Sequence, residues 1–92
     1  SEVSSLPSLS HGTEIRSPDK DLELHYHLGV GYKEMGLFDY AITEFELASE
    51  DPSMKFECYM MLGECFKEKG DSEQSIKYFG LASKIKELPK GL

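Results

Sequence analysis

The residues that could carry chemistry in this chain are two cysteines and three histidines. Cys58 and Cys65 are seven residues apart, which on a helix places them two turns apart on one face. Their Cα atoms would then be about 10.5 Å apart, whereas a disulfide needs less than about 7 Å. We therefore expect two separate, buried and reduced thiols, which favours a cytoplasmic protein.

The histidines do not have the spacing of a metal site. His25 and His27 are two residues apart, so on a helix they point to different faces and cannot share a metal ion. His11 lies in a Ser-rich segment and has no recognisable partner. A Gly-rich phosphate loop, a nucleophile elbow and metal-ligand spacing are also missing from the sequence. We therefore expect a non-catalytic protein that uses neither a cofactor nor a metal.

Composition and charge narrow the class of partner. The chain has 92 residues, enough for one domain, and is 39% hydrophobic and 29% charged. Its net charge of −7 opposes binding to nucleic acid or to an anionic membrane, because both require basic side chains. No apolar run approaches the roughly 20 residues of a membrane span, and no signal peptide is recognisable. Because the sequence has no initiator Met, we expect a piece of a longer cytoplasmic protein.

The chain divides into a Ser-rich segment and a region with helical period. Residues 1–17 hold six serines, and we interpret them as a linker or disordered tail. Docking of this tail on the folded part stays open, because it contains Val3, Leu6, Leu9 and Ile15. We expect a domain over residues 18–89 and a short tail over residues 90–92.

Four helices are expected in this domain, because Pro, Gly and Asp residues divide the apolar pattern. The first begins at Pro18 and ends at Gly36; the second carries residues 40–48; the third begins at Pro52, capped by Asp51, and ends at Gly70; the fourth begins at Asp71 and fades at Pro89. Asp71 to Gln74 has the spacing of a capping box. Helices joined by such short loops pack as antiparallel neighbours.

Two stretches of the chain are nearly identical. Residues 27–36 read HLGVGYKEMG, and residues 61–70 read MLGECFKEKG. Residues 22–55 align with residues 56–89 without an insertion. The alignment matches Leu28 with Leu62, Gly29 with Gly63, Tyr32 with Phe66, and Phe45 with Phe79. Each glycine leaves room for two helices to cross closely, and we expect the larger matched residues to fill the space around the crossing.

These motifs resemble the tetratricopeptide repeat, which reads W-x2-L-G-x2-Y, then A-x3-F, then P over 34 residues. The first repeat reads His25-x2-Leu28-Gly29-x2-Tyr32, then Ala41-x3-Phe45, then Pro52; the second reads Tyr59-x2-Leu62-Gly63-x2-Phe66, then Ser75-x3-Phe79, then Pro89. The resemblance implies an all-α helical-repeat fold, a fragment of an α-solenoid with repeats at 22–55 and 56–89. Because His25 replaces a large aromatic residue, we expect a looser first edge.

The resemblance also implies a function, which is that of a non-catalytic scaffold for protein–protein interaction. The first helix of each pair lines a concave groove that takes up a peptide or a partner helix. The matching groove positions are Glu23, Tyr26, Val30 and Lys33 in the first repeat, and Glu57, Met60, Glu64 and Lys67 in the second. The lysines and asparagines with which chaperone-binding members clamp a terminal carboxylate are replaced here, so we expect a partner with apolar and basic residues. Tyr26 and Met60 packing only on each other is the alternative.

Self-association is the other function that the sequence leaves open. The fourth helix carries an apolar stripe with nothing after it in sequence to cover it, formed by Tyr78, Leu81, Ile85 and Leu88. A weak symmetric homodimer could cover this stripe, as could a helix of a parent protein or the tail of residues 1–17.

Overall fold

The computed structural model describes the backbone of residues 18–87 and the side chains of residues 21–87. The predictions for residues 1–17, Leu88, Pro89 and residues 90–92 lie outside the described residues. The described chain is all-α. Its helices are α2 (Pro18–Glu34), α3 (Phe38–Ala48), α4 (Lys55–Lys69) and α5 (Ser72–Glu87), with a short 3-10 helix, η2 (Pro52–Met54), ahead of α4.

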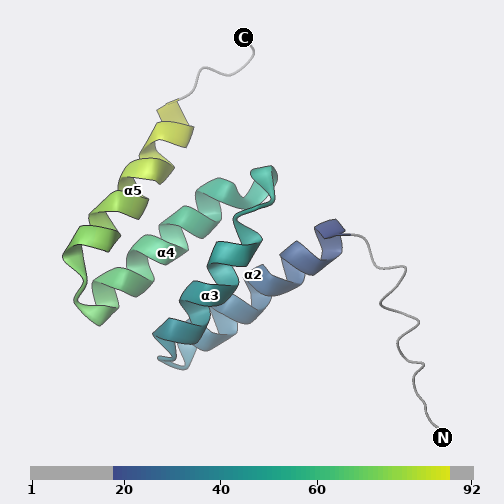
Figure 1. The fold of residues 1–92 in the computed structure, drawn as a ribbon, viewed down its shortest axis with the longest axis horizontal. Helices are drawn as coiled ribbons and strands as arrows, with labels where there is room; N and C mark the ends of the chain where they lie inside the picture. The colour runs from purple at the N-terminus through teal and green to yellow at the C-terminus, as the bar shows by residue number, and fades with distance from the viewer. Residues whose placement is uncertain (1–17, 88–92) are drawn as a thin grey trace, which may run out of the picture.

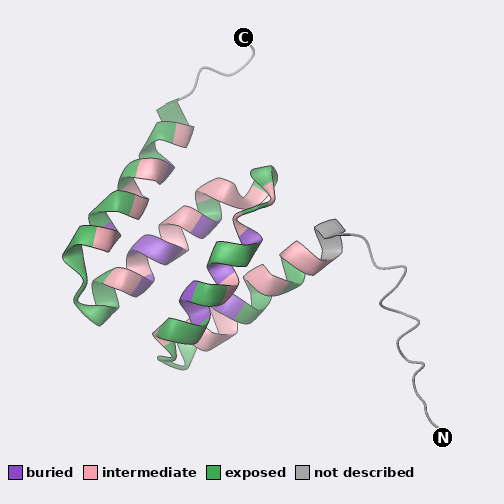
Figure 2. Ribbon diagram, viewed as in Figure 1, coloured by how far each residue is buried: buried purple, intermediate pink, exposed green. Residues whose placement is uncertain are grey.

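The helices follow one another in space in the order of the sequence. α2 packs against α3, α3 against α4, and α4 against α5, so that two helical hairpins stand side by side (Figure 1). α2 and α5 therefore lie at the two ends of the stack. The buried residues gather on the two middle helices, α3 and α4, as the purple segments show (Figure 2).

Glycine ends the first helix of each hairpin, as the sequence predicts. Gly36 and Gly70 have φ angles of +80° and +87°, a conformation that residues with a Cβ rarely adopt. The residue after each glycine donates its N–H to the carbonyl oxygen five residues earlier: Leu37 to Tyr32 and Asp71 to Phe66, both at 2.9 Å. These bonds define the same left-handed C-cap in both hairpins.

The starts of α4 and α5 differ in detail from the prediction. Asp51 does cap a helical turn, since its carboxylate accepts the N–H of Ser53 at 3.0 Å, but that first turn is 3-10 rather than α. Asp71 accepts the N–H of Gln74 at 3.2 Å. The N–H of Asp71 itself is donated to the preceding helix, so it is not available for the reverse bond of a capping box.

The two glycine crossings are confirmed. A Cβ placed on Gly29 would lie 2.7 Å from the ring of Phe45, and one placed on Gly63 would lie 2.7 Å from the ring of Phe79. Both distances are shorter than van der Waals contact, so only glycine allows these approaches. In the second crossing, the Ser75 hydroxyl also donates to the carbonyl oxygen of Gly63 at 2.8 Å.

Leu28 does not fill a crossing, and that prediction is wrong. Leu62 is completely buried and packs in one cluster with Ile42 and Phe45 of α3. Leu28 occupies the matching position on α2 and is 40% exposed. The difference arises because α4 has the α2–α3 hairpin before it, whereas no described helix precedes α2.

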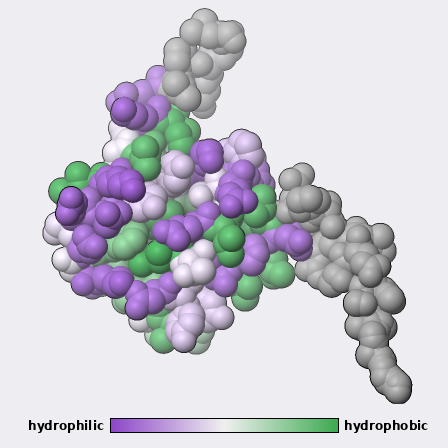
Figure 3. Space-filling view, in the orientation of Figure 1, coloured by the Kyte–Doolittle hydropathy of each residue, from purple (hydrophilic) through white to green (hydrophobic). Residues whose placement is uncertain are grey.

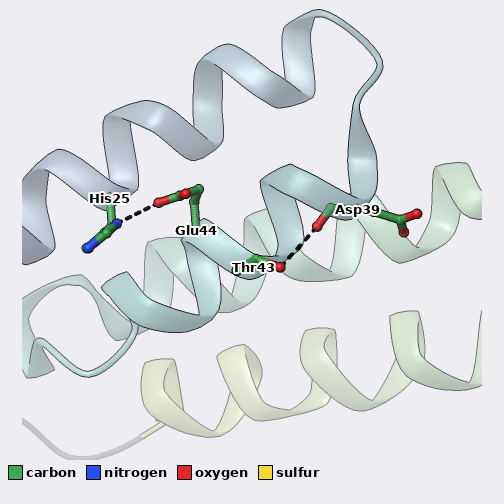
Figure 4. Close-up of polar contacts among 4 residues, drawn as sticks. All are labelled: His25, Asp39, Thr43 and Glu44. Carbon is green, nitrogen blue, oxygen red and sulfur yellow. Dashed lines mark hydrogen bonds and ion pairs between the residues drawn. The ribbon is translucent and has the colours of Figure 1, made fainter.

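His25 makes a polar contact across the first hairpin. Its Nδ1 lies 2.5 Å from Oε1 of Glu44 and joins α2 to α3, while Thr43 donates to the backbone carbonyl of Asp39 at 3.3 Å within α3 (Figure 4). The matching residues of the second hairpin, Tyr59 and Tyr78, make an aromatic contact with ring centroids 5.8 Å apart.

Candidate functional site

The two thiols are buried, as the sequence predicts, and are not placed for chemistry. Cys58 and Cys65 are both free and completely shielded from solvent. Burial raises the pKa of each thiol from 9.0 to about 11, so both remain protonated near neutral pH. Within residues 21–87, no group of His, Cys, Asp and Glu side chains is arranged to hold a metal ion.

The eight predicted groove positions form two stripes that lie side by side on α2 and α4. The Tyr26 hydroxyl donates to Oε1 of Glu57 at 3.3 Å, and Nζ of Lys33 lies 3.1 Å from Oε1 of Glu64. Each contact joins residues 31 positions apart, and moving seven residues along α2 moves the contact seven residues along α4. The first helices of the two hairpins therefore run parallel along this surface.

The groove residues differ in how far they are open to solvent. Tyr26, Val30, Lys33, Met60 and Glu64 are half-buried, whereas Glu23, Glu57 and Lys67 are exposed. Tyr26 and Val30 both pack against the core, and the Tyr26 ring centroid lies 5.7 Å from that of Phe45. Burial, and then the charge of Glu57, raises the pKa of Tyr26. Tyr26 is thus anchored in the core, with its hydroxyl directed toward α4.

Some of the charges at the predicted groove positions are paired within the structure. Lys33 and Glu64 form an ion pair with each other, and Glu23 lies 3.9 Å from His27 on the same helix. Glu57 and Lys67 are exposed and form no ion pair with the other predicted positions, and Val30 and Met60 are half-buried. The sequence analysis did not predict these pairs. Both pairs join residues that are 31 positions apart in the sequence, three fewer than the 34-residue repeat. Residues able to bond to each other at this separation are the sequence signal from which the pairs could have been predicted.

The apolar stripe predicted on α5 is partly used inside the second hairpin. The Tyr78 ring stacks on Phe66 at 5.7 Å with an interplanar angle of 3°, and it also contacts Tyr59. Leu81 and Ile85 are half-buried, and Leu88 lies outside the described residues. The view in Figure 3 shows a mostly hydrophilic surface on which apolar residues appear in separate patches.

None of the helices of the described region is long and apolar enough to span a membrane. Comparison with solved structures found no significant match. A search of curated proteins matched the Transcriptional activator NprA of Geobacillus stearothermophilus, 28% identical over 75 residues that cover 75% of this chain. The match covers only 18% of the length of that relative.

The family comparison concerns the second hairpin. The family model of the tetratricopeptide repeat matches residues 56–87, which form all of α4 except its first residue and the whole of α5. These residues contain the Gly63–Phe79 crossing and the glycine that ends α4. Tetratricopeptide repeats typically serve protein–protein interaction and not catalysis. The chain therefore carries a tetratricopeptide repeat, formed by helices α4 and α5.

Proposed function

We propose that this chain is a protein-interaction module with two tetratricopeptide repeats, and that the groove of α2 and α4 binds a peptide or a partner helix. The observation that carries the proposal is the pair of contacts from Tyr26 to Glu57 and from Lys33 to Glu64, 31 residues apart in each case. They align the two helices into one continuous surface. The Gly29–Phe45 crossing, which matches Gly63–Phe79, supports treating α2–α3 as the first repeat.

The chemistry of the groove favours a partner with both apolar and basic residues. Val30 and Met60 offer partly exposed apolar surface, and a thioether adapts readily to different shapes. Glu57 adds an exposed negative charge, and the chain as a whole carries −7. A terminal carboxylate would find only Lys67 as an unpaired lysine among these positions, because Lys33 is already paired with Glu64. The same negative charge makes a nucleic-acid ligand unfavourable.

The similarity to NprA suggests what kind of larger protein contains such a module. That relative is named a transcriptional activator, and the aligned part is 18% of its length. We extend this to the proposal that the module binds a protein partner as part of a larger cytoplasmic regulator. The proposal assigns neither catalysis nor cofactor to residues 18–87.

Selection from a peptide library against the full chain tests the groove. We expect the selected peptides to combine apolar and basic residues. Both Glu57→Lys and Met60→Ala should weaken their binding, and the charge reversal at Glu57 should do so by about 10-fold. Glu50→Lys is the matched control, because it makes the same charge change at an exposed residue outside the groove. Tyr26→Phe is preferable to Tyr26→Ala, since the ring packs against Phe45 and truncation would disturb the core.

Two outcomes would contradict the groove proposal. One is a set of selected peptides whose binding survives both Glu57→Lys and Met60→Ala. The other is equal loss in Glu57→Lys and in the control Glu50→Lys, which would indicate a general effect of net charge.

A further inference from the structure

The outer side of α5 exposes an isoleucine whose counterpart in the first hairpin is buried. Ile42 on α3 is 8% exposed and belongs to the same core cluster as Leu62 and Cys65 of α4. Ile76 lies 34 positions later on α5 and is 70% exposed. The two residues have the same type and the same place in their hairpins. Their exposure differs because α4 covers α3, whereas no described helix covers α5.

The outer side of α2 shows the complementary exposure. Four residues with helical spacing form one face, which we call the α2 stripe: Leu24, Leu28, Gly31 and Met35. Their counterparts on α4 are Cys58, Leu62, Cys65 and Lys69. The first three of these counterparts are completely buried, and Lys69 pairs with Asp39 of α3. On α2, by contrast, Leu24 is 45% and Leu28 is 40% exposed.

We propose that copies of this chain associate head to tail, with α5 of one copy packing on the α2 stripe of the next. The packing follows the contact between α3 and α4 that already exists inside the chain. α5 repeats the α3 side of that contact through Ile76, and α2 repeats the α4 side through Leu28. Each copy thus carries both halves of the interface, and the two halves are different surfaces. Such an interface joins successive copies and does not close as a symmetric dimer.

The charges of the two end helices favour this unlike pairing. α5 contains three lysines and two glutamates, whereas α2 contains four acidic residues and two lysines. Two α5 helices facing each other would pair helices that each carry one more lysine than glutamate, and two α2 helices would pair helices that each carry two more acids than lysines. The head-to-tail arrangement sets a helix of net positive charge against one of net negative charge, which is favourable.

The contact between copies reproduces the internal contact only in part. Gly31 stands where α4 has Cys65, so a side chain is missing from the interface. The contact between copies also lacks an equivalent of the ion pair of Asp39 with Lys69, because Glu73 and Met35 stand at the matching positions. We therefore expect association at high protein concentration. Completing the pair by Met35→Lys should strengthen it, while Met35→Glu should weaken it by placing like charges together.

Analytical ultracentrifugation of the full chain over a concentration series tests the proposal. We expect the average mass to rise past that of a dimer as concentration increases. Leu28→Asp and Ile76→Asp should each weaken association by at least about 10-fold, since each buries a charge in the interface. Thr43→Asp, at an exposed position of α3, is the matched control and should leave association unchanged.

Mixing the two interface variants tests whether the contact joins α5 to α2 or joins the same helix of two copies. The Leu28→Asp variant retains an intact α5, and the Ile76→Asp variant retains an intact α2 stripe. An equimolar mixture should therefore form a one-to-one heterodimer and nothing larger. Circular dichroism of both variants should match the unsubstituted chain, because both residues are substantially exposed.

Three results would overturn the proposal. The first is a strict monomer at all concentrations, which would mean that another segment or another protein covers the two ends. The second is a dimer that Ile76→Asp abolishes and Leu28→Asp leaves intact, which would indicate symmetric pairing of α5. The third is a mixture of the two variants that stays monomeric while the unsubstituted chain associates.

Discussion

Two neighbouring glycines of α2 allow a sharp test of the helix crossing. In Gly29→Ala the new Cβ would lie 2.7, 2.8 and 2.9 Å from three ring atoms of Phe45. That ring is completely buried, so it cannot move away without displacing other core residues. In Gly31→Ala, two residues along the same helix, the new Cβ would meet nothing within 4 Å. The two substitutions therefore differ in packing and share the same change in helix propensity.

The expected size of each effect follows from these distances. Alanine in a helix interior is more favourable than glycine by about 1 kcal/mol, and both variants gain this. Overpacking a filled core costs about 1–3 kcal/mol, and only Gly29→Ala incurs that cost. We expect Gly31→Ala to raise the free energy of unfolding by about 1 kcal/mol, and Gly29→Ala to change it by between zero and about −2 kcal/mol.

Thermal and urea unfolding followed by circular dichroism measure this difference. For a domain of this size, about 1 kcal/mol corresponds to a Tm change of about 4–8 °C. Gly63→Ala should cost less than Gly29→Ala, because the opposing Phe79 is only half-buried and can yield toward the open side of α5. The reasoning is refuted if Gly29→Ala is as stable as Gly31→Ala, since the crossing would then be looser than the distances indicate.

Three further predictions concern other contacts of the fold. Burial raises the pKa of Cys58 and Cys65 from 9.0 to about 11, so the thiols ionise at lower pH in the unfolded chain than in the folded one. The stability that the protonated thiols contribute should therefore be lost between about pH 9 and 11. A free energy of unfolding that stays constant over that range would contradict this prediction. A double-mutant cycle of His25→Ala and Glu44→Ala should give a coupling of about 1 kcal/mol in urea unfolding, and zero coupling would mean that the contact is absent in solution. Gly70→Ala should lower the free energy of unfolding by about 1–2 kcal/mol, because φ is +87° there, and Gly70→Asn should cost less.

The local features of the fold could be predicted from the sequence because nearby residues determine them. Gly36 and Gly70 end their helices through their own positive φ angles. Asp51 caps a turn through an atom two residues away. The crossing at Gly29 requires a contact across the hairpin, but the repeat of the same glycine and phenylalanine 34 residues later made it recognisable.

Other features could not be predicted because they depend on which element lies next to a residue. His25 and Glu44 stand at the positions that Tyr59 and Tyr78 hold in the second hairpin, but they make a polar contact where the tyrosines make an aromatic one. The residues next to His25 in the sequence do not indicate that its partner is Glu44. The exposure of Leu28 likewise differs from that of Leu62, although both follow the same motif. Side-chain type and spacing give the face of a helix, whereas burial requires knowledge of the helix that covers it.

The proposed groove and the proposed contact between copies depend on the same arrangement of helices. Inside the chain, Tyr26 of α2 contacts Glu57 of α4, 31 residues later. If α5 of one copy packs on α2 of the next as α3 packs on α4, the same register brings Met60 of the first copy to Glu23 of the second. The grooves of the two copies would then be continuous. A partner long enough to span both would bind more tightly than one that occupies a single groove, because its second contact is made at high effective concentration. Such a partner would in turn favour association, since binding to two copies stabilises the contact between them.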